Sequence, residues 1–425
     1  MPSKDIFPFR ANRARMKREF NAQARIGKYG KTGLDRVAFT PVYGEVRDLV
    51  EGWMKEAGLM TRVDAVGNLY GRKEGRVRGL PAVMAGSHLD SQSPGGRFDG
   101  PAGVLTALEA IRRIGETGIA HDHPIEIVAF VGEESACGMT VFGSSVATGV
   151  VGVKDLKNTV HPPTGKSIYE AIEAVGGNPA RTRSCRIKTG SLKAFLELHI
   201  EQGPVLEAAE VPIGVVDRVV GYTRGEVHFT GVTAHSGGQP MPYRKDAGIA
   251  AADFMVRMET YVNRAPDSQR VTITFGEMEA HPGWVSIVPG GARLSFDLRS
   301  KSQAVMERTL ARMEKTLAAI EKERGVKGRL SDVKKLAVCP ASDNIQKALR
   351  RASKETGHAA LTLSSGGVHD ACRMAEICPM GMVFIPSVGG LSHTPEEFTH
   401  FDDMVKGAEI LASAIAHLAE EKVRA

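Results

Sequence analysis

LPAVMAGSHLDSQSPGGRFDGPAGVLTALEAIRRI, residues 80–114, sets the pattern from which the fold of this chain can be predicted. It begins with an apolar run, 80–88, that is typical of a buried strand, and it ends with apolar residues at helical spacing over 103–114. The connecting loop is rich in glycine and carries one histidine and two aspartates. Taken alone, this loop is either an ordinary polar turn or part of a metal site. The residues at the ends of the other predicted strands distinguish these two interpretations.

The same alternation recurs along most of the chain. Further apolar runs typical of buried strands lie at 124–134, 193–203 and 382–387, and a helix is predicted at 344–357. Strands that alternate with helices favour a mostly parallel sheet with helices on its faces. We therefore expect an α/β fold with a mostly parallel sheet.

A different pattern begins after about residue 217. Strands are predicted at 225–235, 270–280, 291–300 and about 327–338, and helices at 245–262 and 303–325. The order βαββαβ is that of a ferredoxin-like α+β unit. Because 425 residues are too many for one compact core, we expect a second domain, 217–334, inserted into a catalytic domain formed by 1–216 and 335–425.

The composition is that of a soluble globular protein, with 42% hydrophobic and 24% charged residues. No apolar run approaches the roughly 20 residues that span a bilayer, and no signal-peptide core begins the chain. The net charge of +6 is dispersed, and the basic cluster at 10–20 lacks a nucleic-acid motif. The five cysteines lack paired metal-ligand spacing. We expect a cytoplasmic protein with reduced cysteines that binds neither membranes nor nucleic acid.

Acidic residues and histidines gather where the predicted strands of the catalytic domain end. Because open α/β sheets bind ligands at the carboxyl ends of their strands, we expect these side chains to meet. A single such residue is more often a cap or turn residue, but four such strand ends in one chain favour a metal site. The residues concerned are His88, Asp90, Asp99, Glu133, Glu134, His199 and His393.

Five of these residues are predicted metal ligands: His88, Asp99, Glu134, His199 and His393. Imidazole and carboxylate ligands suit divalent ions such as zinc, manganese, cobalt or nickel. Five ligands are too many for one tetrahedral zinc with an open position, but they can hold two ions if Asp99 bridges them. We therefore expect one or two divalent ions in each subunit.

The adjacent residues Glu133 and Glu134 are predicted to have different roles. Successive side chains of an extended segment point apart, so we assign Glu134 as a ligand and Glu133 as the general base that later protonates the leaving nitrogen. Spacing alone would also permit the reverse assignment. Asp90 is expected either to accept a hydrogen bond from the second nitrogen of His88 or to stabilise the loop.

Six motifs occur in an order that resembles one known family. They are GSHLDSQSPGGRFDG (86–100), GEESACGMTVFGS (132–144), LELHIEQGPVLE (196–207), TAHSGGQPMPYRKDA (233–247), GGVHDA (366–371) and SVGGLSHTPEE (387–397). The chain is similar to the N-carbamoyl-L-amino-acid hydrolase and allantoate amidohydrolase group of the dinuclear-metal aminoacylase and carboxypeptidase superfamily. The similarity runs over almost the whole chain.

The resemblance implies an α/β catalytic domain with the ligands and base assigned above, and a smaller lid domain that also forms a homodimer. It further implies that His235 on the lid reaches the active site of the partner subunit and stabilises the developing oxyanion. Arg299 matches the family arginine that binds the substrate carboxylate, for which a guanidinium fork is well suited. Gln202 is expected to make a polar contact with the substrate.

Departures from the family pattern concern the substrate pocket. Residues 135–138 lack the arginine and the aromatic ring that follow the glutamate pair in the family. Ser286 stands where the family carries an asparagine expected to hold the substrate. Two further motifs are altered, with SGGQPM after the lid histidine and VHDA in place of GHDA. The sequence therefore departs from the family in the substrate pocket, whereas the residues predicted to bind metal keep the family pattern.

The predicted reaction is hydrolysis of a non-peptide C–N bond by attack of metal-bound water. The expected substrate is a small molecule bearing a carboxylate, an N-carbamoyl (ureido) amino acid or related amide, with an amino acid, carbon dioxide and ammonia as products. The alternative is a divergent enzyme that cleaves an acyl amide or a dipeptide, or that deaminates an electron-poor aminoaromatic. A non-catalytic scaffold is disfavoured because every predicted ligand and the base are present.

Overall fold

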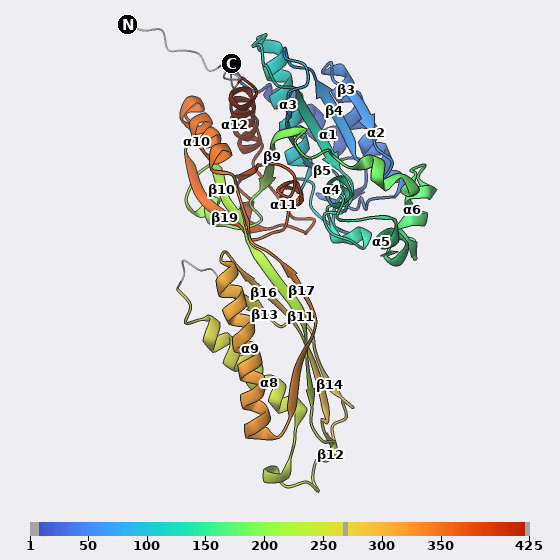
Figure 1. The fold of residues 1–425 in the computed structure, drawn as a ribbon, viewed down its shortest axis with the longest axis vertical. Helices are drawn as coiled ribbons and strands as arrows, with labels where there is room; N and C mark the ends of the chain where they lie inside the picture. Colours follow the sequence, from blue (N-terminus) through green and yellow to red (C-terminus); the bar gives the residue numbers. More distant parts are fainter. Residues whose placement is uncertain (1–7, 267–270, 421–425) are drawn as a thin grey trace. The chain divides into compact units, whose positions relative to one another are not determined.

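The structure, a computed structural model, describes residues 8–266 and 271–420. It divides into two compact units, the first formed by Met1–Asp217 with Ala341–Ala425 and the second by Arg218–Pro340 (Figure 1). None of the helices in these described ranges is long and apolar enough to cross a membrane.

The observed limits of the second unit differ from the predicted insertion at its end. The predicted start at 217 adjoins the observed boundary, whereas the predicted end at 334 falls inside β17 (Lys327–Leu336). This strand pairs with β11 (Gly221–Thr230) as far as Leu336, opposite Tyr222. Cutting the chain at 334 would break this ladder, so the division comes later, at Pro340.

The first unit is built on a nine-stranded sheet with the order β18–β10–β20–β9–β5–β6–β4–β3, and β19 (Ala360–Ser365) pairs with β10. Four central strands run parallel, and the strands that flank them pair antiparallel. The central strands are β20 (Met380–Ile385), β9 (Leu192–Ile200), β5 (Ala82–His88) and β6 (Ile125–Phe130). The flanking strands are β3 (Met60–Val63), β4 (Leu69–Lys73), β10 (Ile213–Val219) and β18 (Cys339–Pro340).

The prediction of a mostly parallel sheet is therefore wrong outside the four central strands. Alternation of strands and helices does not show which strands become neighbours. The turn between β3 and β4 is tight, because the Asp64 carboxylate accepts the backbone N–H groups of Val66, Gly67 and Asn68, each at 3.0 Å. A connection this short joins antiparallel strands only.

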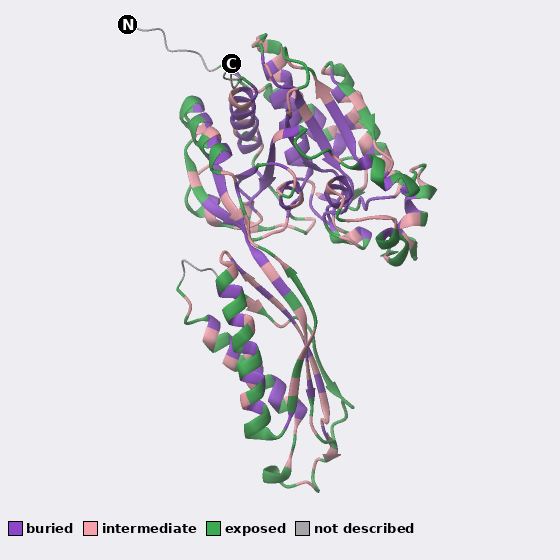
Figure 2. Cartoon of the chain, viewed as in Figure 1, coloured by how far each residue is buried: buried purple, intermediate pink, exposed green. Residues whose placement is uncertain are grey.

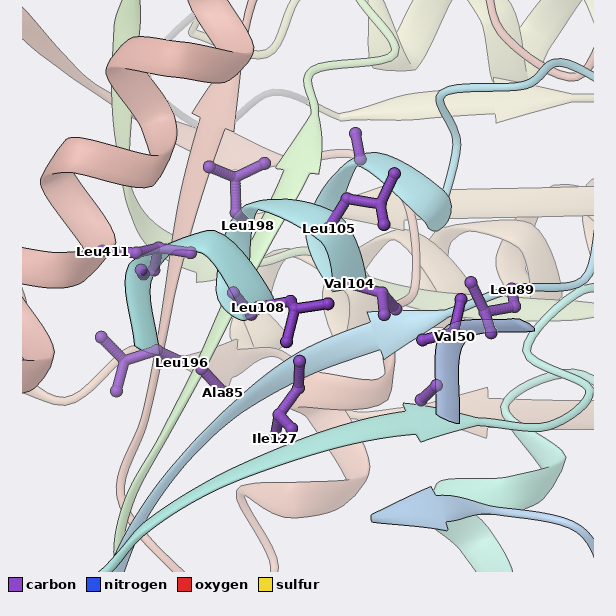
Figure 3. Packing of buried hydrophobic residues seen from close by; sticks show 14 of the residues in the cluster. Val50, Ala85, Leu89, Val104, Leu105, Leu108, Ile127, Leu196, Leu198 and Leu411 are labelled. Atoms are coloured by element: carbon purple, nitrogen blue, oxygen red, sulfur yellow. The ribbon is translucent and has the colours of Figure 1, made fainter. Parts of the chain in front are cut away.

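Both faces of the central strands are covered, which explains their uninterrupted apolar runs. Val83 and Ala85 of β5 and Leu196 of β9 belong to one buried cluster with helices α3 (Pro101–Thr117) and α12 (Phe401–Ala419) (Figure 3). Glu197, the next residue of β9, points to the opposite face, where Oε2 accepts the first-turn N–H of α11 (Asp370–Met374) at 2.9 Å. The sheet thus lies between helices.

Further helices and short strands complete the first unit. They are α1 (Arg13–Gln23), β1 (Lys28–Tyr29), β2 (Gly33–Leu34), α2 (Pro41–Glu56), α4 (Phe142–Thr148), α5 (Val153–Asn158), β7 (Val160–His161), β8 (Lys166–Ser167), α6 (Ile168–Ala174), α7 (Val205–Ala208) and α10 (Asp343–Thr356), with short 3-10 turns at Ser135–Cys137, Pro179–Cys185 and Val388–Gly390.

The second unit has a five-stranded antiparallel sheet with the order β13–β16–β11–β17, and β14 also pairs with β16. Helices α8 (Ala247–Val262) and α9 (Gln303–Arg324) share a buried cluster with the sheet. In β16 (Gly291–Ser300) buried residues alternate with partly exposed ones, as expected when one face of a sheet is covered. Figure 2 shows the corresponding exposed faces of both helices.

Two predicted strands of this unit are broken. The segment 225–235 ends as a strand at Thr230, and a separate short strand, β12 (Ala234–His235), pairs with β15 (Ile287–Val288). The segment 270–280 begins outside the described residues and is divided into β13 (Thr272–Thr274) and β14 (Met278–His281). Between them the Glu277 N–H donates to the Ser295 side chain, which interrupts the ladder.

Gly103 and Gly115 of α3 provide a test of how closely this helix packs on the sheet. A Cβ at position 103 would overlap the Leu198 carbonyl oxygen, whereas at position 115 it would meet the flexible end of Lys73. We expect Gly103→Ala to lower the free energy of unfolding by about 1–3 kcal/mol through overpacking. Gly115→Ala is expected to be neutral or to stabilise by up to about 1 kcal/mol, because alanine favours helix. Denaturant unfolding measures both, and equal effects would contradict this packing.

Candidate metal centre

The five predicted metal ligands meet at the carboxyl ends of the parallel strands. His88 is the last residue of β5, and His199 lies near the end of β9, its parallel neighbour. Glu134 follows β6, and His393 follows β20 after a turn. Asp99 lies in the loop between β5 and α3, two residues before the helix begins at Pro101. Parallel strands thus place ligands from distant parts of the sequence at one edge.

One group of candidate ligands consists of His88, Asp99 and His199. His88 Nε2 lies 3.4 Å and His199 Nε2 lies 3.0 Å from the same oxygen, Asp99 Oδ1. The Nδ1 atoms lie 3.1 Å and 2.9 Å from the carbonyl oxygens of Asp90 and Ile200, which orients each Nε2 toward the centre. His88 Nε2 is buried and has no well-formed hydrogen bond within the described ranges. A buried imidazole nitrogen in this position is suited to bind a metal ion.

A second group consists of Asp99, Glu134 and His393. His393 Nε2 lies 3.4 Å from Asp99 Oδ2 and 3.6 Å from Glu134 Oε1. Asp99 belongs to both groups and offers one oxygen to each, which is the arrangement of a bridging carboxylate. The His393 side chain is 49% exposed whereas the Glu134 side chain is 5% exposed, so this group is open to solvent on the side of the imidazole.

Glu133 and Glu134 contact different partners. Glu133 Oε2 lies 3.8 Å from His88 Nε2, whereas Glu134 Oε2 accepts a hydrogen bond from Gln92 Nε2 at 2.6 Å. Burial raises the pKa of Glu133 well above its usual range, with the nearby Glu134 carboxylate adding to the effect against the opposing influence of His88. A carboxylate that takes up a proton readily is suited to act as a base.

Negative charge is crowded in this centre. Burial and the Asp99 carboxylate raise the pKa of Glu134 to about 7. The hydrogen bond to Asp99 raises the pKa of His393 to about 9. Burial by itself lowers the pKa of His88, but the surrounding carboxylates outweigh it and raise that pKa well above the usual value. These shifts show that the carboxylates attract positive charge, which a divalent cation would supply.

Asp90 stabilises the loop after β6. Its Oδ1 accepts the N–H groups of Gly132 at 2.9 Å and Glu133 at 3.3 Å, and its Oδ2 accepts the N–H of Glu134 at 3.0 Å. The carboxylate lies 3.7 Å from His88 Nδ1, which instead contacts the Asp90 carbonyl oxygen. Of the two alternatives for Asp90, the geometry therefore favours stabilisation of the loop that carries both glutamates.

Gln202, a predicted substrate contact, reaches the ligands themselves. Its Nε2 donates to Asp99 Oδ2 at 2.7 Å and to Ser392 Oγ at 3.2 Å, and it lies 3.3 Å from His393 Nε2. The amide therefore orients the shared carboxylate in this structure. Contact with a substrate stays a prediction.

The remaining three predicted site residues, His235, Ser286 and Arg299, belong to the second unit. His235 and Ser286 lie together, because the Ser236 N–H donates to the Ser286 carbonyl oxygen at 2.9 Å beside the β12–β15 pair. His235 Nδ1 accepts the N–H groups of Gly237 and Gly238 at 3.1 and 3.0 Å. In the neutral imidazole the proton is then on Nε2, which makes that exposed nitrogen a donor.

Arg299 lies far from His235 within the second unit. It is near the end of β16, opposite Tyr222 and Thr272, whereas the turn that leads to His235 adjoins the start of the strand at Gly291. Eight residue steps along a strand correspond to roughly 25 Å. Arg299 Nε and Nη2 each lie 3.0 Å from a carboxylate oxygen of Asp297.

Several buried or partly buried polar residues around the centre were not predicted. Glu197 accepts hydrogen bonds from Ser87 Oγ at 2.7 Å and from the Ala371 N–H at 2.9 Å, so both its oxygens support the scaffold behind His199. The His369 ring lies 4.4 Å from the His199 ring. Gln92 and Glu397 were also missed, although both lie in motifs that contain ligands, SHLDSQ and SHTPEE.

Comparisons with known proteins show the relationships of the chain. A family model described as Peptidase family M20/M25/M40 matches residues 84–417. The N-carbamoyl-L-amino acid amidohydrolase of Geobacillus stearothermophilus is 35% identical over 402 residues, covering 93% of this chain and 96% of that protein. The allantoate amidohydrolase of Bacillus subtilis is 30% identical over 397 residues, covering 93% and 95%.

A solved structure gives the same relationship. The crystal structure of an amidase of the hydantoinase/carbamoylase family from Burkholderia multivorans has a TM-score of 0.88 at 34% identity, and the match covers 98% of this chain and 100% of that one. The predicted resemblance is thereby confirmed. So is the predicted class of enzyme, a hydrolase of C–N bonds other than peptide bonds. The chain belongs to the peptidase family M20/M25/M40.

Proposed function

We propose that this enzyme hydrolyses an N-carbamoyl (ureido) amino acid or a related small amide that bears a carboxylate. The observation that carries the proposal is the pair of ligand groups that share Asp99, with the Glu133 carboxylate 3.8 Å from His88 Nε2. The names of the relatives support the class of substrate, since they include an N-carbamoyl-L-amino acid amidohydrolase and an allantoate amidohydrolase.

The donor set suits one or two divalent ions of the zinc, manganese, cobalt or nickel class. His88, Asp99 and His199 would hold one ion, and Asp99, Glu134 and His393 the other. Ions bound there would supply a Lewis acid that activates water and polarises the substrate carbonyl.

Glu133 moves the proton in the reaction. It takes a proton from the water whose oxygen attacks the carbonyl carbon, and it gives that proton to the nitrogen when the C–N bond breaks. The leaving nitrogen thus departs as a neutral amine. With a ureido substrate this cleavage leaves a carbamic acid, which decomposes to carbon dioxide and the second amine, so the final products are an amino acid, ammonia and carbon dioxide.

The second unit supplies contacts to the substrate. His235 donates a hydrogen bond from Nε2 to the oxyanion that develops on the carbonyl oxygen, which agrees with the tautomer set by the Gly237 and Gly238 N–H groups. Arg299 binds the substrate carboxylate through its guanidinium fork. Ser286, beside His235, contacts the part of the substrate that an asparagine would hold.

These contacts require two copies of the chain. Arg299 lies roughly 25 Å along β16 from Gly291, the end of the strand that adjoins the turn to His235, which is more than a small amino acid derivative can span. A substrate that touches both residues must take them from different subunits. The second unit, whose sheet order β13–β16–β11–β17 with helices α8 and α9 supports a ferredoxin-like lid, therefore also forms the homodimer. A cytoplasmic location and the absence of nucleic-acid binding stay predictions from sequence.

A second candidate function is hydrolysis of another C–N bond, in an acyl amide, a dipeptide or an electron-poor aminoaromatic. The loop after the glutamate pair favours this alternative. Gly138 has φ +97° and a Cβ there would overlap the Val160 carbonyl oxygen, so the aromatic side chain of the family has no room. Cys137, in place of the family arginine, is buried.

A substrate panel separates these functions. We expect the ion-loaded enzyme to release ammonia from N-carbamoyl-L-amino acids, and to act less on allantoate, N-acyl amino acids, dipeptides and aminoaromatics. Ammonia and free amine should both be measured, because N-acyl amino acids and dipeptides release a free amine and no ammonia. Activity confined to the compounds without a ureido group would contradict the proposed substrate.

Glu133→Gln tests the base. The amide keeps the shape of the side chain but cannot accept the proton, so we expect kcat to fall by about 10²–10⁴-fold while the ion content, measured by mass spectrometry, stays unchanged. Glu173→Gln, an exposed substitution on α6, is the matched control and should keep full activity. Full turnover by Glu133→Gln would show that another group takes the proton.

Mixing two inactive variants tests whether the sites are shared. Glu133→Gln and His235→Ala chains, unfolded and refolded together, form dimers of which about half are mixed. If His235 acts on the partner subunit, each mixed dimer holds one intact site, and about a quarter of the parent activity returns. If His235 acted within its own chain, every site would lack one residue and the mixture would stay inactive.

A further inference from the structure

Glu397 is a buried carboxylate beside the metal centre that has no part in the proposed reaction. It is 1% exposed. Its Oε1 accepts the backbone N–H groups of Phe98 and Asp99, both at 2.9 Å. Burying a carboxylate is costly unless its oxygens are hydrogen-bonded. Here the bonds are made to the loop that carries the shared ligand.

The second carboxylate oxygen of Glu397, Oε2, contacts the turn that carries His393. Ser392 Oγ lies 3.0 Å from Glu397 Oε2 and 2.9 Å from Asp99 Oδ2. The Glu397 N–H donates to the Thr394 carbonyl oxygen at 3.1 Å and closes the turn. One side chain therefore joins two ligand loops that are widely separated in sequence.

The backbone of both loops fits this contact. A Cβ at Gly96 would overlap the Glu397 carboxylate, so the loop before Asp99 requires glycine at that position. His393 has φ +58°, a left-handed conformation that is costly for a residue other than glycine and persists only when its surroundings enforce it. The turn closed by Glu397 provides such surroundings.

We propose that Glu397 is a positioning residue that holds the Asp99 and His393 loops together and thereby sets the affinity of the centre for its ion. This inference rests on the divalent-ion centre proposed above. The length of the side chain is decisive, because Oε1 must reach two N–H groups while Oε2 reaches the Ser392 hydroxyl. Residues that orient ligands in this way change metal affinity by about 10–100-fold when they are replaced.

Glu397→Asp and Glu397→Gln separate length from charge. Aspartate keeps the charge but is shorter by one methylene, whereas glutamine keeps the length and an acceptor oxygen but loses the charge. We expect Glu397→Asp to bind Co²⁺ about 10–100-fold more weakly than the parent chain in competition with a chelator, with a changed visible spectrum of the bound Co²⁺. Glu397→Gln is expected to keep nearly the parent affinity and spectrum.

Glu396→Asp is the matched control. This neighbouring carboxylate is exposed and accepts a hydrogen bond from Thr394 Oγ1 at 2.8 Å, within its own turn. It should leave Co²⁺ binding unchanged. The melting temperature of each ion-free variant shows whether the chain is folded. If Glu397→Asp does not fold, Ser392→Ala cuts the same link and should weaken binding instead.

Two results would overturn the inference. One is parent affinity and spectrum in a folded Glu397→Asp or in its substitute Ser392→Ala. The other is loss of Co²⁺ binding in Glu397→Gln while Glu397→Asp still binds Co²⁺. The charge of Glu397, and not its length, would then determine the affinity. A parent chain that bound no Co²⁺ would instead overturn the proposed ion centre itself.

Discussion

The Asp99 carboxylate is the constraint on which the rest of the centre depends. One oxygen faces His88 and His199 and the other faces His393, so a single side chain links both ligand groups. The loop must bring this carboxylate back over the end of β5. Gly100 permits this, because it has φ +81° and a Cβ there would overlap the His88 ring. The residue that follows, Pro101, begins α3, whose N-terminus favours a negative charge nearby.

The carboxylates of the centre keep their positions because backbone groups hold them. Asp90 accepts three N–H groups from the loop after β6, and Glu397 accepts two from the loop before α3. Hydrogen bonds from a rigid backbone orient a ligand without adding a competing cation. Since the loops belong to strands buried on both faces, the ligand geometry is set by the packing of the sheet.

The sequence predicts the parts of this centre that depend on local pattern. Apolar runs that end in histidine or acidic residues identify His88, Glu134 and His199, because parallel strands bring their ends together. It does not predict contacts that depend on which loops become neighbours. Glu397 lies 298 residues from Asp99, and only the folded sheet brings the two together. The antiparallel edges of the sheet were missed for the same reason, since alternation gives no order of strands.

The residues with proposed roles are divided between the two units of the chain. The candidate ligands and Glu133 all lie in the first unit, whereas His235, Ser286 and Arg299 lie in the second. Under the proposed function, a change at Ser286 would alter a contact to the substrate without touching any candidate ligand. Under the same proposal, cleavage of the bond therefore depends on the ligands at the sheet of the first unit, while the contacts to the substrate come from the residues around β12 and β15 and from β16 of the second.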